Sequence, residues 1–137
     1  MMMHSILKEP VKASIGQQPY KVKIVWRNGE LIADEPESVG GQDLGPDPFT
    51  LLAAALATCT LSTLKMYIDR KAWPVNSIQV DVNIAQNNDE VLVSAFERSI
   101  SIDGTIDNIQ RERLLHIAKS CPVSKLLEHQ IQLKTTI

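Results

Sequence analysis

A loop rich in glycine and proline leads directly into a long apolar segment in residues 40–74, GGQDLGPDPFTLLAAALATCTLSTLKMYIDRKAWP. The first nine of these residues hold three glycines and two prolines, a composition that predicts an irregular loop. Asp47 is a good helix N-cap, and Pro48 suits the first helical position, where its missing N–H costs nothing. No breaker follows before Pro74, so we expect a helix from Pro48 to about Lys71.

The first half of this expected helix is apolar around its whole circumference. Residues 51–57 read LLAAALA, and a helix that is apolar on every face is expected to be buried on every face. The run is too short to span a bilayer, so we predict no membrane partner. The second half is amphipathic, with Lys65, Asp69, Arg70 and Lys71 expected on its exposed face.

Strands and shorter helices are expected on both sides of the long helix. Apolar and polar residues alternate in several segments, which is typical of half-buried strands. The expected elements are strands at 11–15, 20–26 and 31–33 with an Asn28-Gly29 turn, strands at 75–85 and 91–102, a helix at 108–120 capped by Asp107 with an apolar stripe of Ile109, Leu114, Ile117, Ala118 and Cys121, a short helical turn through 127, and a strand at 131–137. This order predicts one α+β domain over residues 1–137.

Composition narrows the function classes. The chain has 137 residues, 44% hydrophobic and 22% charged, with a net charge of -2. That length is enough to bury a core without disulfide or metal staples. The acidic balance argues against a dedicated nucleic-acid binder. No targeting segment is recognisable after Met1, so we expect a cytoplasmic protein.

Two cysteines, Cys59 and Cys121, are the strongest candidates for chemistry. In a reducing compartment they are expected to be thiols rather than a permanent bridge. The three histidines show no ligand spacing with them, so we predict no metal site and no cofactor. Each cysteine alone could be a small core residue. Both belong to elements that share one core, however, and two thiols within reach form a reversible redox couple.

Other polar residues have simpler structural interpretations. Asp43 and Asp47 flank the glycine-proline loop and could act as carboxylate bases, but a turn and a helix cap are the simpler explanation of them. The glycines of residues 40–45 are not followed by the Lys-Ser/Thr pair of a phosphate-binding loop. His116 lies just off the apolar stripe of its helix and is expected to be exposed.

The motifs and their order resemble the OsmC/Ohr family, in its branch with a Gly-Pro-x-Pro helix start. The residues that carry the resemblance are 40–52, Cys59-Thr60, 64–67, 70–74, Phe96-Glu97-Arg98, 102–104, 110–115 and Cys121-Pro122-Val123. The resemblance implies an α+β sandwich of antiparallel sheets around long central helices, assembled as an intertwined homodimer. It also implies thiol sites near the subunit interface.

The resemblance further implies a thiol-dependent reductase of organic hydroperoxides or hydrogen peroxide that acts in oxidative-stress defence. In that mechanism Cys59 attacks the peroxide as a thiolate and becomes a sulfenic acid. Cys121 then condenses with it to a disulfide, which an external dithiol reduces. Only the thiolate is strongly nucleophilic, and a resolving thiol prevents over-oxidation, so these residue types suit the chemistry.

The chain departs from the family pattern at the charges that activate the thiol. Phe49 stands where family peroxidases have a glutamate, and Gln17 and Gln18 lie in the hairpin turn that carries their arginine. Arg27, in the next turn, is a candidate to replace that thiolate-stabilising cation. Four residues are expected to form a more apolar pocket beside Cys59: Asp43, Pro48, Phe49 and Leu52. The missing charge pair favours an alternative, a non-catalytic member that binds a small apolar ligand or senses oxidants, whereas the two cysteines favour the enzyme.

Overall fold

The structure is a computed structural model that describes residues 1–137. The chain forms two compact units, residues 1–51 and 52–137, and each contains an antiparallel sheet. Three α-helices complete the chain, which is therefore of the mixed α+β class that the sequence predicts.

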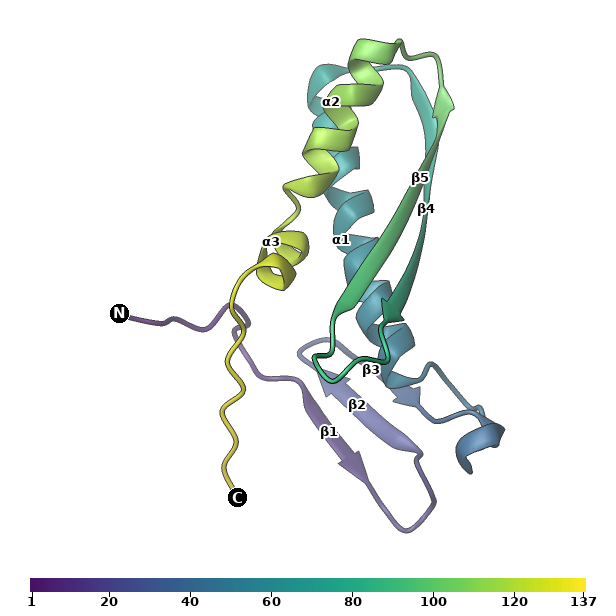
Figure 1. The fold of residues 1–137 in the computed structure, drawn as a ribbon, viewed down its shortest axis with the longest axis vertical. Helices are drawn as coiled ribbons and strands as arrows, with labels where there is room; N and C mark the ends of the chain where they lie inside the picture. The colour runs from purple at the N-terminus through teal and green to yellow at the C-terminus, as the bar shows by residue number, and fades with distance from the viewer. The chain divides into compact units, whose positions relative to one another are not determined.

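The first unit is built on a three-stranded antiparallel sheet with β2 in the centre (Figure 1). Its strands are β1 (Lys12–Ile15), β2 (Val22–Trp26) and β3 (Gly29–Ala33). The β2–β3 turn consists of Arg27 and Asn28, because Trp26 pairs with Gly29. The glycine of the expected Asn-Gly turn is thus already the first residue of β3.

The glycine-proline loop folds around one buried carboxylate at the end of β3. Asp34 is only 2% exposed. Its carboxylate oxygens accept backbone N–H groups from Glu35 at 2.8 Å, Gln42 at 3.2 Å and Leu44 at 3.3 Å. Buried polar groups need such partners, so Asp34 fixes the path of the loop that leads into the long helix.

Two glycines allow this loop to lie directly against β3 and the residues that follow it. A Cβ atom on Gly41 would come within 1.9 Å of the Glu35 carbonyl oxygen, and one on Gly45 within 2.0 Å of the Ile32 carbonyl oxygen. No side chain fits at such distances. The loop also holds a short 3₁₀ helix, η1 (Glu37–Val39), before the long helix begins.

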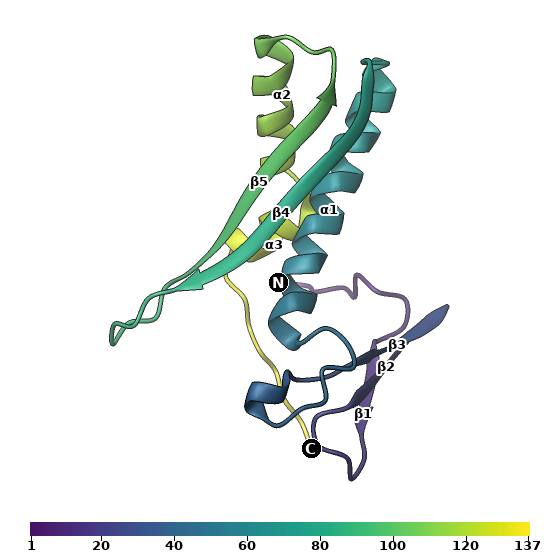
Figure 2. The same ribbon diagram turned by 90° about the vertical axis from the view of Figure 1, so that its right-hand side faces the viewer.

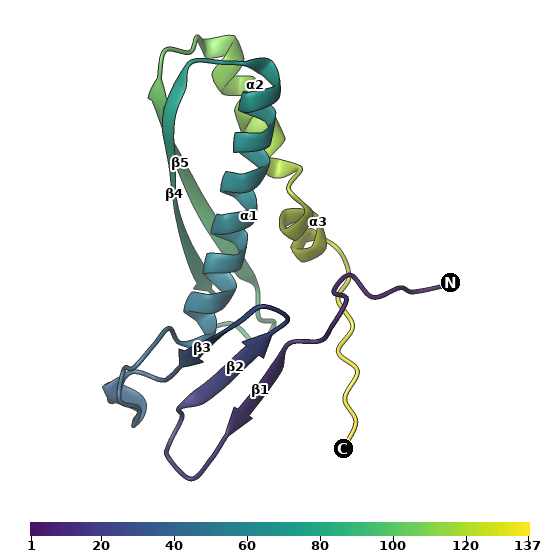
Figure 3. The same cartoon turned by 180° about the vertical axis from the view of Figure 1, so that it is seen from behind.

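The second unit packs helices against a long β-hairpin. Its elements are α1 (Pro48–Lys71), which begins at the end of the first unit, β4 (Val75–Gln86), β5 (Ser94–Gly104), α2 (Asn108–Lys119) and α3 (Pro122–Glu128). Figures 2 and 3 show the β4–β5 hairpin along one side of α1, with α2 beside the C-terminal half of α1. The bounds of α1 confirm the helix expected from Pro48 to Lys71.

The core of the second unit lies between α1, α2 and the hairpin. Its buried residues are Leu64, Tyr67 and Ile68 from α1 and Leu114 and Ala118 from α2. Partly buried residues of the hairpin and its flanks pack against them: Trp73, Val75, Ile78, Ile100, Ile102, Ile106 and Ile117. The antiparallel register aligns the apolar residues of β4 and β5 on the face that meets the helices.

Three details of the expected elements differ from the structure. Residues 130–137 form no strand. The expected strand at 91–102 begins only at Ser94, because the Asn87 side chain accepts the Val93 N–H at 2.7 Å and closes a turn there. Ile109, expected on the apolar stripe of α2, is 82% exposed, since it lies about 180° around the helix from the buried Ala118.

The expectation that α1 is buried on every face is wrong for this chain. Its buried residues are confined to one side: Leu56, Thr60, Leu64, Tyr67 and Ile68. Phe49 is 69% and Met66 73% exposed, because the hairpin and α2 cover the helix only in part. By length and composition α1 could cross a membrane, with a mean hydropathy of 1.5, a test that core helices of soluble proteins also pass.

Candidate active site

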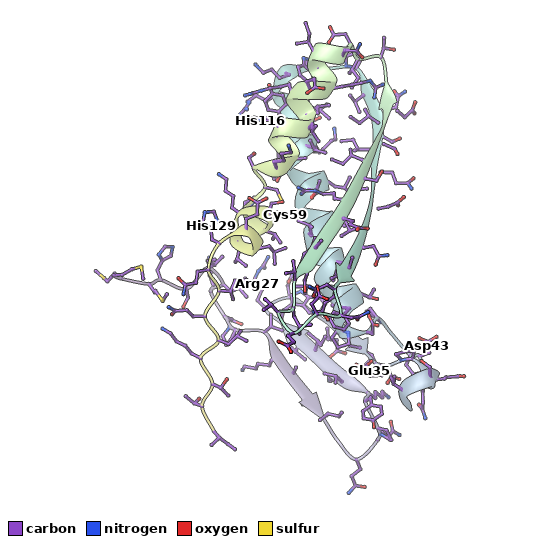
Figure 4. The ribbon with its side chains drawn as sticks, viewed as in Figure 1. Arg27, Glu35, Asp43, Cys59, His116 and His129 are labelled. Atoms are coloured by element: carbon purple, nitrogen blue, oxygen red, sulfur yellow. The ribbon has the colours of Figure 1, made fainter.

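The two cysteines meet in the second unit. Cys59 comes from α1, and Figure 4 places it beside α3; Cys121 lies between α2 and α3. Both are free thiols, and the Cys59 side chain lies near enough to Cys121 to lower the pKa of that thiol. Cys121 is 0% exposed, whereas Cys59 is partly exposed. The structure therefore brings together the two thiols that the sequence singles out.

The backbone around Cys121 holds its sulfur in place. The Cys121 N–H donates to the Ala118 carbonyl oxygen at 3.3 Å and so closes the last turn of α2. Pro122, which has no N–H to satisfy, then begins α3. Cys121 is the N-cap of this short helix, and its sulfur accepts the Ser124 N–H at 3.3 Å.

Arg98 approaches this sulfur from the hairpin. It lies on the face of β5 that is turned toward the helices. Its Nη1 donates to the Ser124 hydroxyl at 2.8 Å, the Thr60 hydroxyl at 2.9 Å and the Ala118 carbonyl at 3.2 Å, and lies 3.8 Å from the Cys121 sulfur. One nitrogen carries only two protons, so these four acceptors share them. Arg98 thereby links β5, α1 and the α2–α3 junction.

No carboxylate pairs with Arg98. The ion pairs Lys23–Glu30 and Lys65–Asp69 both lie at other exposed positions. Among the groups bonded to the guanidinium, two hydroxyls and a carbonyl remain neutral, and only the Cys121 sulfur can become an anion. Because a partly buried charge is stable only when it is compensated, the sulfur is the natural counter-ion of Arg98.

The hydrogen bonds around Cys121 also favour its ionised form. Burial raises the pKa of the Cys121 thiol, but hydrogen bonding to the Ser124 hydroxyl and N–H, and then the contacts with Cys59 and Thr60, outweigh it. The pKa of Cys121 therefore lies below its ordinary value. This sulfur combines low solvent access with a surrounding set of donors, which is the environment that stabilises a thiolate.

A cavity of about 200 Å³ lies next to Arg98. It is lined by Leu56, Ser94, Phe96, Arg98, Ser124, Leu127 and Glu128. All hydrogen bonds of the Arg98 side chain use Nη1, and the chain has no buried side-chain nitrogen or oxygen without a partner. The Nε and Nη2 atoms of Arg98 therefore reach solvent, where a small polar ligand could contact them.

The other residues expected to form the site lie at the surface of the chain. Arg27 is exposed in the β2–β3 turn of the first unit (Figure 4). Asp43 is exposed in the glycine-proline loop with a φ of 55°. Pro48, Phe49 and Leu52 are exposed in the first turns of α1. Their roles as stabilising cation and pocket remain predictions. Nowhere do three or more His, Cys, Asp or Glu side chains gather as a metal ion would require.

Sequence reasoning missed Arg98, Thr60 and Ser124 as members of the site. One signal was available for Arg98, which falls in phase with Phe96 and Ile100 on the inward face of an alternating strand. A charged residue at such a position needs a buried partner. Thr60 and Ser124 carried no signal, because a hydroxyl within a helix is usually explained by local bonding to the backbone.

Known proteins resemble the chain in sequence pattern and in structure. The family model described as OsmC-like protein matches residues 40–136. A comparison with curated proteins finds no significant sequence match. An OsmC-like protein from Mycoplasma pneumoniae superposes with a TM-score of 0.75 at 16% identity, covering 90% of this chain and 89% of that one.

Two further solved structures are organic hydroperoxide resistance proteins. The one from Legionella pneumophila, OsmC, has a TM-score of 0.67 at 19% identity and covers 90% of this chain and 91% of its own. The one from Bacillus subtilis has a TM-score of 0.63 at 18% identity, with 89% and 91% covered. At these identities the likeness establishes the fold that the chain shares with them.

Proposed function

Because this chain belongs to the OsmC-like protein family, we propose that it is a hydroperoxide reductase that uses Cys59 and Cys121 in oxidative-stress defence. The observation that carries the proposal is the closeness of two free thiols, one from α1 and one from the α2–α3 junction, next to the guanidinium of Arg98. Solved structures with this fold include organic hydroperoxide resistance proteins. We place the protein in the cytoplasm, where reduced thiols persist.

The proposed cycle has three steps. A thiolate of the pair attacks one peroxide oxygen, forming an S–O bond and breaking the O–O bond, and the alkoxide takes up a proton and leaves as an alcohol. The second thiol attacks the resulting sulfenic acid, so that an S–S bond forms and water leaves. An external dithiol then reduces the disulfide by thiol–disulfide exchange. The cycle needs no cofactor.

We also propose that the working form is a homodimer in which each chain acts as one OsmC-like domain, with sheets packed around central helices. The exposed apolar side chains of α1, including Phe49, Leu52 and Met66, support this proposal. A soluble monomer rarely leaves large apolar side chains clustered along one helix. Sedimentation equilibrium should give twice the chain mass, and a monomeric mass would contradict the proposed assembly.

The decisive experiment measures consumption of an organic hydroperoxide in the presence of a dithiol reductant. Cys59→Ser should abolish turnover, and Cys121→Ser should consume about one equivalent of peroxide and then stall. Thr58→Ser is the matched control, because Thr58 is an exposed neighbour on the same helix; this variant should keep full turnover. Negligible turnover in the unmodified protein and in all three variants would refute the enzyme.

The absence of the family's glutamate and arginine, with Phe49, Gln17 and Gln18 in their places, favours one other function. In that alternative the pair senses oxidants stoichiometrically, or the fold binds a small apolar ligand. A sensor would lose two titratable thiols per chain on addition of peroxide without catalytic turnover. A ligand-binding member would lose none.

A further inference from the structure

Either sulfur of the thiol pair can carry a negative charge when it loses its proton. We infer that the thiolate resides on Cys121, with Arg98 as its counter-ion, and that Cys121 acts as the proton acceptor for Cys59. The charge assignment stands on geometry alone, whereas its catalytic meaning rests on the proposed peroxide reduction. Cys59 remains the sulfur that peroxide reaches, and Arg98 acts on it only through Cys121.

The first argument is the direction of the hydrogen bonds around Cys121. Its sulfur receives the Ser124 N–H at 3.3 Å and faces the Arg98 Nη1 at 3.8 Å, and neither group can accept a proton. A thiolate only accepts hydrogen bonds, so it satisfies both donors, whereas an S–H group must also find an acceptor. The Thr60 hydroxyl donates to the Leu56 carbonyl at 2.7 Å, so at 4.0 Å from the sulfur it offers an S–H only an acceptor that is more distant than both donors.

The second argument is the charge around the sulfur on every packed element. The ionisable groups that face it are Cys59 from α1 and Arg98 from β5. The charged and titratable side chains of α2 and α3 near it in sequence, His116, Lys119, Lys125 and Glu128, are all exposed. A neutral Cys121 would leave the Arg98 guanidinium without an anion, and an ionised Cys121 compensates it. The depressed pKa of Cys121 agrees with this assignment.

The third argument concerns access. Cys121 is 0% exposed, so a peroxide cannot reach its sulfur without local opening, whereas Cys59 is partly exposed. The Cys59 side chain lies near Cys121 and influences the pKa of that thiol, so the Cys59 proton has a short path to the Cys121 sulfur. The burial of one thiol and the exposure of the other therefore separate two tasks, holding the charge and meeting the substrate.

These arguments give a balanced reaction sequence. Cys59 passes its proton to the Cys121 thiolate as its sulfur attacks the hydroperoxide; an S–O bond forms, the O–O bond breaks, and the sulfur is oxidised by two electrons. The alkoxide product takes the proton back from Cys121 and leaves as an alcohol. The regenerated Cys121 thiolate then attacks the Cys59 sulfur and displaces hydroxide, which becomes water on taking a proton from solvent. The external dithiol completes the cycle.

In this arrangement Arg98 is a positioning residue. It takes over the task of the charge pair that the chain lacks at Phe49, Gln17 and Gln18, but it serves the second cysteine rather than the first. An anionic resolving thiol also condenses faster with a sulfenic acid than a neutral thiol does. The Cys121 thiolate would thereby shorten the time during which Cys59 is open to over-oxidation.

The test is a titration of the reduced protein without peroxide, following the thiolate by its ultraviolet absorbance and by the pH dependence of alkylation. Cys59→Ser should keep an ionisation below the ordinary cysteine range, because Arg98 and Ser124 remain. Cys121→Ser should lose it. The opposite pattern, with the low ionisation lost in Cys59→Ser and kept in Cys121→Ser, would overturn the inference, and so would an ordinary pKa in both variants.

Substitutions of the cation provide a second measurement. Arg98→Gln should raise the lower ionisation by about one pH unit or more, since an opposite charge within a few ångströms shifts a pKa by about one to three units. Arg98→Lys should restore part of this shift. Arg113→Gln is the matched control, because Arg113 bonds to the Tyr67 hydroxyl at 3.0 Å and should leave the titration unchanged. An unchanged titration in Arg98→Gln would contradict the assignment.

The titration tests the charge assignment and the peroxide assay tests the proposed function, so either hypothesis can be refuted without the other. A low ionisation on Cys121 in a protein that consumes no peroxide would refute the proposed function and keep the charge assignment. Peroxide turnover in a protein whose low ionisation is lost in Cys59→Ser would support the proposed function and refute the charge assignment. Circular dichroism of each variant identifies any that does not fold, and the two serine variants alone suffice to decide the assignment.

Discussion

Replacing Thr60 by valine should destabilise the second unit by about 2 kcal/mol. Thr60 is 0% exposed, and besides its 4.0 Å contact with the Cys121 sulfur its hydroxyl makes two short hydrogen bonds in the site. It donates to the Leu56 carbonyl at 2.7 Å and accepts Nη1 of Arg98 at 2.9 Å. Valine has almost the same shape and helix propensity, so the substitution removes the hydroxyl and little else.

The size of the expected loss in unfolding free energy depends on which of these two hydrogen bonds has no substitute in the variant. The Leu56 carbonyl keeps its regular helical hydrogen bond, so losing the second donor there costs little. The guanidinium of Arg98 loses a well-aligned acceptor in a partly buried position, and hydrogen bonds to charged groups contribute about 1.5–3 kcal/mol. The remaining acceptors, the Ser124 hydroxyl and the Ala118 carbonyl, keep the loss near the lower half of that range.

Urea unfolding in reducing buffer, compared with Thr58→Val, measures this effect. Thr58 lies on the same helix and donates to the Ala55 carbonyl at 3.1 Å, but its side chain is exposed. Its replacement should change the free energy of unfolding by less than about 0.5 kcal/mol. If Thr60→Val were no more destabilising than Thr58→Val, the role of Thr60 in holding Arg98 would be refuted.

Three further outcomes follow from the packing and the ionisation. Leu114→Ala, at a residue 1% exposed, should lower the free energy of unfolding by about 2–5 kcal/mol in the urea assay, against less than about 0.5 kcal/mol for the exposed Ile109→Ala. Gly45→Ala should unfold the loop of the first unit, measured as faster amide exchange in residues 40–46, because its Cβ would meet the Ile32 carbonyl at 2.0 Å. The pKa of Cys121 is lower in the folded than in the unfolded chain, so its stabilising contribution is lost as pH falls through the folded pKa and complete above the unfolded one. The stability advantage of the unmodified protein over Cys121→Ser should therefore grow as pH rises toward the ordinary cysteine pKa; an advantage that does not change with pH would contradict the shift.

Local signals were sufficient for most of the fold. The N-cap pattern at Asp47 and Pro48 located the start of α1, and the Asp107 cap is confirmed by its bond from the Gln110 N–H at 2.7 Å. The alternation of apolar and polar residues located the two strands of the hairpin, because the set of side chains that share one face of a strand depends only on that strand's own sequence. These features depend on residues close together in sequence, which is why a single sequence reveals them.

Features set by distant contacts could not be predicted in this way. The apolar character of α1 indicated burial, but how much of the helix is covered depends on how far the hairpin and α2 extend over it. Alternation in residues 131–137 indicated a strand, yet a strand forms only where another strand offers hydrogen bonds, and β5 pairs with β4 alone. Periodicity therefore identifies the face that a helix or strand could bury, but it does not identify the element that covers this face.

The candidate site shows how much the alternation of side chains along a strand can predict by itself. Alternation along the strand puts Arg98 on the same face as Phe96 and opposite Glu97, and the structure has that arrangement. An arginine among inward-facing apolar residues must end near a group that compensates its charge. The aspartates and glutamates of the sequence offer no partner for the Arg98 charge, because the compensating group is a cysteine. A cysteine is counted as neutral when formal charges are added up. Counting thiols as potential anions wherever a cation falls on an inward face would have connected Arg98 to Cys121.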